Sequence, residues 1–324
     1  MKKNKYLNKK MTINLEKLKV IVDFGKNDIY ETLIALDEEE KSEYFIKKTS
    51  KSILEDQIKN KYFENEVNVN QYLDHENIIK FYEKKDILND TYLIFEVANG
   101  GNINDNLKKY MEKNKKPFSE EIVQIIIKQA SIALKYLHDS HILFRNLDLE
   151  HILVDYDSIE DRANLNFSNS KIKIGNFHFS KILEDNELAH SFIGIPVYMD
   201  PNISFHNNEL NKIAYEYKSD IWSLGVVCFE LLTGNSPFDG NNFEELVTNM
   251  KTGKYKISKD LNLSIETISF IIGMLQYDPK KRFDINDILN HDFLQKNVKE
   301  FSYKGQEKLG EVEGNEIILN ININ

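Results

Sequence analysis

Cysteine is almost absent from this sequence of 324 residues, in which Cys228 is the only one. A lone cysteine excludes a disulfide within the chain and indicates a reducing compartment. Long hydrophobic runs are also missing: no apolar stretch approaches the ~20 residues of a membrane-spanning helix, and no signal-peptide core is visible. We therefore expect a cytoplasmic protein without a membrane span.

An excess of positive charge is lacking as well. The chain has 52 acidic and 42 basic residues, which gives a formal net charge of −10. Binding to a phosphate backbone needs a basic face, so this balance argues against nucleic acid as the main partner. Residues 1–15 are the exception, because they are rich in lysine. We predict a basic flexible arm there, with weak contact to an anionic membrane as the alternative.

What the sequence does contain is the composition of a globular protein, with 41% hydrophobic and 29% charged residues. Residues 18–22, 30–36 and 44–47 are short apolar runs that predict three strands. The pair Gly100 and Gly101 marks a flexible break between two blocks of different composition. Beyond it, a buried helical face is predicted by the apolar spacing of Ile122, Ile126, Ala130, Ala133, Leu134 and Leu137.

The most informative stretch is residues 141–155, HILFRNLDLEHILVD. It resembles the catalytic loop of protein kinases, whose pattern is H-R-D-L-x-x-x-N between two hydrophobic segments. Arg145 and Leu147 match that pattern. The other positions differ, since Phe144 stands for the His, Asn146 for the catalytic Asp, Asp148 for the loop Lys and His151 for the metal-binding Asn.

Further segments resemble protein kinase motifs in the order in which the family has them. They are Asn176-Phe177-His178 for D-F-G, residues 194–202 for G-T-x-x-Y-x-A-P-E, residues 220–225 for D-x-W-S-x-G, and residues 278–282 and 290–293 for the closing segment. Together they carry the resemblance over residues 18–294. The resemblance implies an α+β, two-lobe protein-kinase-like fold, with a small β-rich N-lobe containing one main helix and a larger, mostly helical C-lobe.

The same resemblance predicts the domain boundaries. The N-lobe is expected at residues 16–97 and the C-lobe at residues 98–299, followed by a charged C-terminal tail at residues 300–324. Residues 156–170 are an insertion within the C-lobe, which we expect to be a solvated loop, with a partner-binding loop as the alternative. The alternation of ILNININ at the end of the tail predicts either an added strand or a disordered end.

The resemblance also places a vestigial ATP site, at Gly25, Asn27, Phe45, Lys47, Glu66, Phe95, Glu96, Ala98 and Leu153. The phosphate loop keeps one of its three glycines, and Tyr30 puts a large ring where the loop should lie close to phosphate. Phe45 replaces the small residue that covers the adenine, and strand alternation puts its ring on the same face as Lys47. Spacing predicts an ion pair between Lys47 and Glu66. We expect ATP and Mg²⁺ binding to be weak or absent, and no other cofactor.

The substitutions in the catalytic loop all oppose phosphoryl transfer, which requires a base, metal ligands and cations near the γ-phosphate. Asn146 cannot accept a proton, and loss of a general base reduces a rate by roughly 10²–10⁴. Asn176 and His151 are poor ligands for a hard cation, so no metal is expected. Asp148 adds a repulsion on the order of 4 kcal/mol toward phosphate at 4 Å and an effective dielectric near 20.

The sequence is therefore identified as a degenerate member of the protein kinase family, a pseudokinase that acts as a binding, scaffolding or allosteric partner of proteins whose identity it does not reveal. The alternative is an atypical Ser/Thr protein kinase with weak residual ATP-dependent phosphotransfer. In that case Asp148, two positions after Asn146, is the candidate base or metal ligand in a rearranged loop.

Three residues are expected to keep structural roles. Asp220 holds the backbone of the loop, and Arg145 ties the activation segment to it. Arg282 has lost its usual glutamate because Asn202 is neutral, and Asp200 is the candidate substitute, since a buried unpaired arginine is costly.

In the family, the residue that corresponds to Arg145 binds a phosphorylated residue of the activation segment. Ser180 and Ser191 are the hydroxyls available for that role here. Without catalysis to regulate, we expect the segment to be ordered without phosphorylation.

Overall fold

The computed structural model describes residues 13–182, 196–202, 212–306 and 309–320. Contacts divide the chain into two units. The first comprises Met1–Asn60 and Phe81–Val97, and the second comprises Lys61–Lys80 and Ala98–Asn324. The boundary after Val97 is the expected one, whereas residues 61–80, predicted in the N-lobe, make their contacts with the second unit. Among the described residues, no helix has the length and apolarity needed to cross a membrane.

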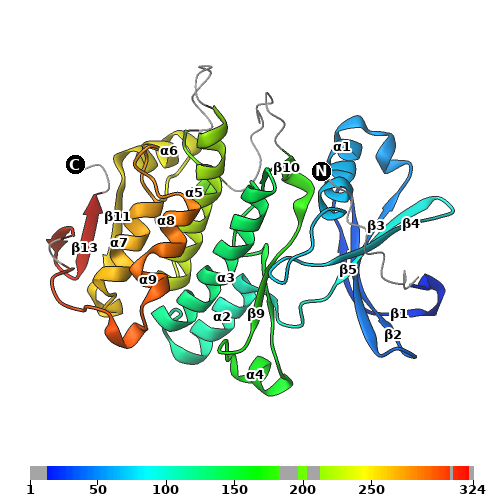
Figure 1. Cartoon of the computed structure of the whole chain (residues 1–324), viewed down its shortest axis with the longest axis horizontal. Coiled ribbons are helices and arrows are strands. Elements are labelled where there is room, and N and C mark those ends of the chain that lie inside the picture. Colours follow the sequence, from blue (N-terminus) through cyan, green and yellow to red (C-terminus); the bar gives the residue numbers. More distant parts are fainter. Residues whose placement is uncertain (1–12, 183–195, 203–211, 307–308, 321–324) are drawn as a thin grey trace. The chain divides into compact units, whose positions relative to one another are not determined.

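The first unit is built on one antiparallel sheet of five strands with the order β1-β2-β3-β5-β4 (Figure 1). The strands are β1 (Leu18–Lys26), β2 (Glu31–Asp37), β3 (Ser42–Ser50), β4 (Phe81–Ile87) and β5 (Asp90–Glu96). Ala35, Tyr44, Ile46 and Ile94 form its small core with Ile13. The three strands predicted from the apolar runs are thus present: β1 and β3 are longer than their runs, and β2 is shifted by one residue.

The turn between β1 and β2 is shorter than expected because β1 continues to Lys26. Asn27 closes this turn: its side-chain oxygen accepts the N–H groups of Ile29 and Tyr30, at 2.9 and 2.8 Å. Gly25 has φ of +84° at an irregularity in the pairing of β1 with β2, a conformation that glycine adopts without strain. The loop is therefore fixed by its own side chains.

The second unit is mostly helical. Its helices are the larger part of α1 (Gln57–Asn70), then α2 (Ile103–Asn114), α3 (Glu120–Asp139), α4 (Ile159–Asn164), α5 (Lys212–Thr233), α6 (Phe243–Thr252), α7 (Ile265–Met274), α8 (Ile285–Asn290) and α9 (Asp292–Gln295). Its strands are β6 (Gly101–Asn102), β7 (Ile142–Leu143), β8 (Ile152–Asp155), β9 (Lys171–Ile174), β10 (Lys181–Ile182), β11 (Lys254–Ser258), β12 (Glu311–Glu313) and β13 (Glu316–Asn320). With the first unit's sheet, this is the α+β protein-kinase-like fold that the sequence predicts.

Helices α3 and α5 carry the core of the second unit. Helix α3 is capped by Ser119, whose side chain accepts the N–H of Ile122. Its predicted apolar face is buried except at Ile122, which is partly buried. Helix α5 contributes the fully buried Trp222. It ends at Thr233, and Gly234 follows with φ of +73°, the usual left-handed termination of a helix. These two helices position the loop that lies between β7 and β8.

The insertion at residues 156–170 differs from the expected solvated loop. It contains α4, between β8 and β9 (Figure 1), and both of its ends are anchored. Tyr156 is buried and donates its hydroxyl to Oδ1 of Asn106 at 2.8 Å. Phe167 is buried against Phe118, with ring centroids 5.2 Å apart. These two buried aromatic side chains anchor the ends of the insertion, although the residues between them are polar.

The tail is folded as far as it is described. Of the two alternatives for its end, the added strand is observed as far as Asn320: β13 pairs with β11 along five residues, and β12 pairs with β13 (Figure 1). The last four residues of the predicted stretch, 321–324, lie outside the described residues. The hairpin turns at Gly314, which has φ of +56°, and Leu319 is fully buried. The hydroxyl of Tyr303 donates to the carboxylate of Glu120 on α3 at 2.8 Å. This segment is therefore part of the second unit.

Candidate functional site

The backbone of the loop between β7 and β8 is held by hydrogen bonds to Asp220 on α5. The fully buried carboxylate of Asp220 accepts the N–H groups of Phe144 and Arg145, at 3.0 and 2.8 Å. It also contacts Nε2 of His138 on α3 at 2.9 Å. Arg145 has φ of +62°, a strained conformation for a side chain of its size. The hydrogen bonds to Asp220 stabilise the backbone in this conformation.

Asn146, His151 and Asn176 come together in the structure and contact one another. The side-chain amides of Asn146 and Asn176 lie 3.2 and 2.6 Å from Nε2 of His151. The other end of the Asn176 amide lies 2.7 Å from Nδ1 of His178. Because two amide groups point at Nε2, this nitrogen accepts hydrogen bonds, and the ring proton resides on Nδ1. The positions that would supply a base and metal ligands thus satisfy each other.

Asp148 contacts the other nitrogen of the same imidazole. Its Oδ1 lies 2.7 Å from Nδ1 of His151 and also accepts the N–H groups of Glu150 and His151. This carboxylate therefore closes a turn of its own loop and lies beside the imidazole, without forming a well-aligned hydrogen bond to Nδ1. The donor set at this place consists of two carboxamides and one imidazole, which does not fit Mg²⁺, a cation that prefers carboxylate and water oxygens. Among the described residues, no group of three or more His, Cys, Asp or Glu side chains is placed to hold a metal ion.

Arg145 and Ser180 connect this loop to the segment that follows Asn176. Nε of Arg145 donates to the carbonyl oxygen of Phe179 at 2.9 Å. Ser180 is buried, and its hydroxyl donates to the carbonyl oxygen of Phe144 at 3.1 Å. Ser180 is therefore a structural hydroxyl. Ser191, the other predicted phosphorylation site, lies outside the described residues.

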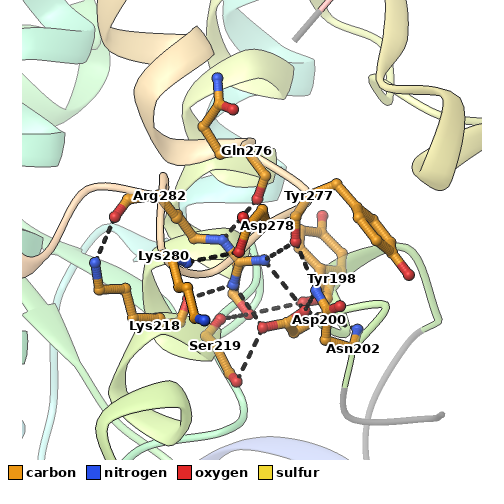
Figure 2. A network of polar contacts seen from close by, with 11 residues as sticks. Tyr198, Asp200, Asn202, Lys218, Ser219, Gln276, Tyr277, Asp278, Lys280 and Arg282 are labelled. Carbon is orange, nitrogen blue, oxygen red and sulfur yellow. Dashed lines mark hydrogen bonds and ion pairs between the residues drawn. The ribbon is translucent and has the colours of Figure 1, made fainter. Parts of the chain in front are cut away.

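Arg282 is fully buried and forms a bidentate ion pair with Asp200, the partner proposed from the sequence (Figure 2). The distances are 2.5 Å from Nη1 to Oδ2 and 3.2 Å from Nη2 to Oδ1. The guanidinium also donates to main-chain carbonyl groups and lies 5.1 Å from the ring of Trp222. Asn202, in the position of the missing glutamate, donates instead to Tyr277 O at 2.7 Å. Every part of the guanidinium thus has a partner.

In the first unit, aromatic rings surround the residues predicted to contact a nucleotide. The ring of Phe45 lies between those of Phe24 and Phe95, with centroid distances of 6.2 and 6.4 Å. Nζ of Lys47 lies 5.1 Å from the ring centroid of Tyr30 and 5.6 Å from that of Phe95. Phe45 and Lys47 share the ring of Phe95, so they project from the same face of β3. The ammonium group is within the range of a cation–π interaction with both rings.

The remaining residues of the predicted ATP site are divided between the units. Gly25, Asn27, Phe95 and Glu96 belong to the first unit, and Glu66, Ala98 and Leu153 to the second. Because Lys47 and Glu66 lie in different units, the ion pair between them stays a prediction. The nucleotide site as a whole stays a prediction for the same reason.

The second unit contains a pocket of about 260 Å³ that was not predicted from the sequence. It is lined by Asn104, Leu107, Lys108, Met111, Asp148, Leu149, Glu150, Tyr198, Glu230, Gly234, Asn235 and Ser236. Three carboxylates and one ammonium group give this lining a negative charge. Burial, and secondarily the charge of Asp148, raise the pKa of Glu230, which accepts a hydrogen bond from the hydroxyl of Tyr198. Apart from the acidic character of the loop, no pattern in the sequence indicated this pocket.

A sequence profile described as the protein kinase domain matches residues 22–294, most of the chain. Among similar proteins, "Probable serine/threonine-protein kinase nek3" of Dictyostelium discoideum is 36% identical over 231 residues, which cover 71% of this chain and 19% of that protein. "Probable serine/threonine-protein kinase nek2" of the same organism is 30% identical over 261 residues, covering 76% and 56%. "Serine/threonine-protein kinase ULK1" of Homo sapiens is 28% identical over 232 residues, covering 71% and 21%.

The aligned stretch therefore spans between 19% and 56% of the length of these three relatives. The profile match extends from β1 to α9 and includes both units of the fold, the loop held by Asp220 and the Arg282 pair. On this evidence, the chain belongs to the protein kinase family.

Proposed function

We propose that this protein is a pseudokinase, which uses the kinase fold to bind other proteins and does not transfer phosphate. The observation that carries the proposal is the contact of Asn146 and Asn176 with the same imidazole nitrogen of His151, at 3.2 and 2.6 Å. A phosphotransferase needs a proton acceptor and metal-binding oxygens at these positions. Here the polar atoms of Asn146, His151 and Asn176 contact one another instead.

The first unit supports the proposal independently. Tyr30 and Phe95 place their rings near the ammonium group of Lys47, the group that would grip phosphates. Both rings take up space beside this ammonium group, on the face of β3 where the resemblance places the nucleotide. Phe45 adds a third ring to the same face. The features that support weak nucleotide binding and those that support lost catalysis therefore lie at separate places in the chain.

The test is a radiolabelled phosphotransfer assay with Mg²⁺ and with Mn²⁺, using a general protein substrate and the chain itself. Lys47→Met, purified in parallel, reports any host kinase that copurifies. We expect wild type and Lys47→Met to give the same background. Phosphotransfer by wild type that Lys47→Met abolishes would overturn the proposal.

Simple repair of the loop should also fail. Asn146→Asp with Asn176→Asp restores a base and one metal ligand, but leaves His151, Asp148 and Tyr30 in place. We expect this double variant to remain far below the ~1–100 s⁻¹ of active kinases. Turnover near that range in the double variant would show that the remaining substitutions are tolerated.

A second candidate function is weak phosphotransfer by an atypical Ser/Thr kinase. It is favoured by the relatives, whose names describe serine/threonine-protein kinases. The base in this candidate is Asp148, the residue named for it from the sequence, which lies two positions after Asn146. This candidate predicts activity that Lys47→Met and Asp148→Asn both remove, so the assay above separates the two functions.

We infer that the bound protein contributes a basic side chain to the pocket of the second unit. Asp148, Glu150 and Glu230 line it together with a single lysine, Lys108. Carboxylates form their strongest hydrogen bonds with guanidinium and ammonium groups, and a pocket of about 260 Å³ accommodates one such side chain. A partner segment that carries an arginine or a lysine would therefore complement the charge of this lining.

A further inference from the structure

Helix α2 and the residues directly after it carry five lysines within nine positions. We call them the lysine patch: Lys108, Lys109, Lys113, Lys115 and Lys116. All five are exposed, and Glu112 is the single acidic residue among them. None of the five forms an ion pair with a described residue, whereas exposed lysines elsewhere, such as Lys17, Lys135 and Lys256, do. In a chain with a net charge of −10, the patch is a local reversal of charge.

The packing of α2 directs this positive side away from the core of the second unit. Ile103 and Leu107 are buried in that core. Met111, one turn after Leu107, packs closely on Gly234, where an added Cβ would lie 2.6 Å from its Cε. Lys109 and Lys113 are four residues apart and share a different side of the helix. The apolar contacts therefore fix α2 with these lysines facing solvent.

The electrostatics of the helix itself explain only part of the patch. The carboxyl end of a helix attracts cations within its last turn, which accounts for Lys113 and for Lys115 at the C-cap. Lys109 lies more than one turn before that end, and Lys116 lies beyond it. Lys109 and Lys113 also repel each other at their spacing of four residues. An anionic partner would relieve this repulsion.

The composition of the patch favours a lipid surface among anionic partners. Phosphorylated peptides are held by arginine, whose guanidinium group forms paired hydrogen bonds with phosphate, and residues 108–116 contain no arginine. Single-stranded nucleic acids stack their bases on aromatic rings, and Tyr110, the one aromatic residue in this stretch, is half-buried against Phe118. Lysines on a helix surface suit a layer of lipid headgroups, which they attract without a fixed geometry.

We propose that the lysine patch binds the anionic headgroups of a membrane surface, without insertion of α2. The negative charge of the whole chain does not prevent this contact, because charges more than about 10 Å apart are largely screened at ~0.1 M salt. Each lysine close to an anionic surface strengthens binding about fivefold. The proposal goes beyond the proposed function and does not rest on it, since it involves no step of phosphotransfer.

Cosedimentation of the full chain with vesicles tests the proposal. The vesicles consist of phosphatidylcholine with about 30% phosphatidylserine, and vesicles of phosphatidylcholine alone are the uncharged control. We expect binding to the anionic vesicles only, and its loss at about 0.5 M salt. Replacing three lysines of the patch should weaken binding about a hundredfold: Lys109→Gln, Lys113→Gln and Lys116→Gln. Lys108 is kept because it also lines the acidic pocket.

The matched control changes the net charge of the chain by the same amount. It replaces three exposed lysines elsewhere in the second unit and should bind within about twofold of wild type: Lys128→Gln, Lys254→Gln and Lys304→Gln. Circular dichroism verifies that each variant is folded. If the triple variant of the patch does not fold, Lys109→Gln with Lys113→Gln decides, with an expected loss of about thirtyfold.

The proposal is overturned if wild type does not bind the anionic vesicles. It is also overturned if the patch and control variants bind equally well, which would assign the binding to the basic arm or to net charge. Tighter binding of wild type to poly(U) RNA or to a polyglutamate peptide than to the vesicles, lost in the patch variant, would overturn it in favour of that partner. The phosphotransfer assay contains no lipid, so failure of this proposal and failure of the proposed function are distinguishable.

Discussion

At the scale of single residues, this chain replaces one arrangement of polar groups by another that is equally well satisfied. Asp200 does for Arg282 what a glutamate two positions later does in the family pattern, and Asn202 has turned to a main-chain carbonyl. A buried arginine needs a partner, so the pairing with Asp200 was predictable from the sequence. The resemblance placed His151 and Asn176 together as altered metal-ligand positions, but the direct contact between their side chains was not predicted.

Removal of Asp200 tests how much the substitute pair matters. Asp200→Asn leaves the guanidinium of Arg282 buried beside a neutral group, and we expect the free energy of unfolding to fall by about 3–5 kcal/mol. Asn202→Glu, which restores the family's residue, should recover part of this loss in the double variant. Urea unfolding followed by circular dichroism measures both effects. A loss below about 1 kcal/mol in Asp200→Asn would contradict the role assigned to this pair.

The acidic pocket gives a prediction about pH. Because the pKa of Glu230 is raised by burial, this carboxyl takes up a proton at a higher pH than an ordinary glutamate, and it then loses its attraction for a cation. An arginine-containing peptide should therefore bind more weakly as the pH falls from 7 toward 5. Fluorescence anisotropy measures the affinity, with the citrulline peptide as the uncharged control.

Two variants sharpen this test. Glu150→Gln should weaken binding of the arginine peptide about tenfold, which corresponds to 1.4 kcal/mol. Glu230→Gln should weaken it and flatten its dependence on pH. Equal affinity for the arginine and citrulline peptides would rule out a cation-binding pocket.

At the scale of elements, the predictions from apolar spacing were right where a strand or helix is stabilised by its own periodic face. Helix α3 and strand β3, in which Tyr44 and Ile46 are buried, are examples. The structures of the insertion and of the tail were harder to predict from the sequence, because each is held by contacts with residues far away in the chain. Tyr156 and Phe167 bracket the insertion, and two aromatic residues at the ends of a polar run were the available signal.

The tail hairpin should contribute to stability as an element of the second unit. Leu319 on β13 is fully buried, and we expect Leu319→Ala to lower the free energy of unfolding by about 2–5 kcal/mol. Val312 on β12 is 47% exposed, so Val312→Ala is a control that should change it by less than about 1 kcal/mol. Thermal unfolding monitored by intrinsic fluorescence compares the two. Equal melting temperatures for both variants would mean that the hairpin is only loosely attached.

At the scale of the whole molecule, the predicted nucleotide site is tested by the stability of the intact chain, because its residues are divided between the two units. A ligand that binds only the folded state adds about 2.7 kcal/mol at a hundredfold excess over Kd. We expect millimolar Mg-ATP, and ATP with EDTA, to leave the melting temperature of wild type unchanged. The rings of Phe45 and Tyr30 and the poor donor set for Mg²⁺ are the physical reasons.

Phe45→Ala is the informative variant for this prediction. It removes the ring packed between Phe24 and Phe95, so the variant should melt at a lower temperature than wild type. It should also gain a rise in melting temperature with adenosine, a probe that avoids the altered phosphate and metal positions. A clear rise of the melting temperature of wild type with Mg-ATP would instead mean that the protein is a nucleotide-binding pseudokinase.

The pairing of β13 with β11 has a practical consequence for anyone who produces this protein. The profile match ends at residue 294, and a recombinant fragment cut there would lack β13 and leave the backbone of β11 unpaired on that side. Tyr255 and Ile257, now buried, would lose the cover that the hairpin provides. An unprotected strand edge with apolar side chains recruits other chains, so such a fragment is expected to aggregate on expression, whereas one that extends through residue 320 keeps its edge covered.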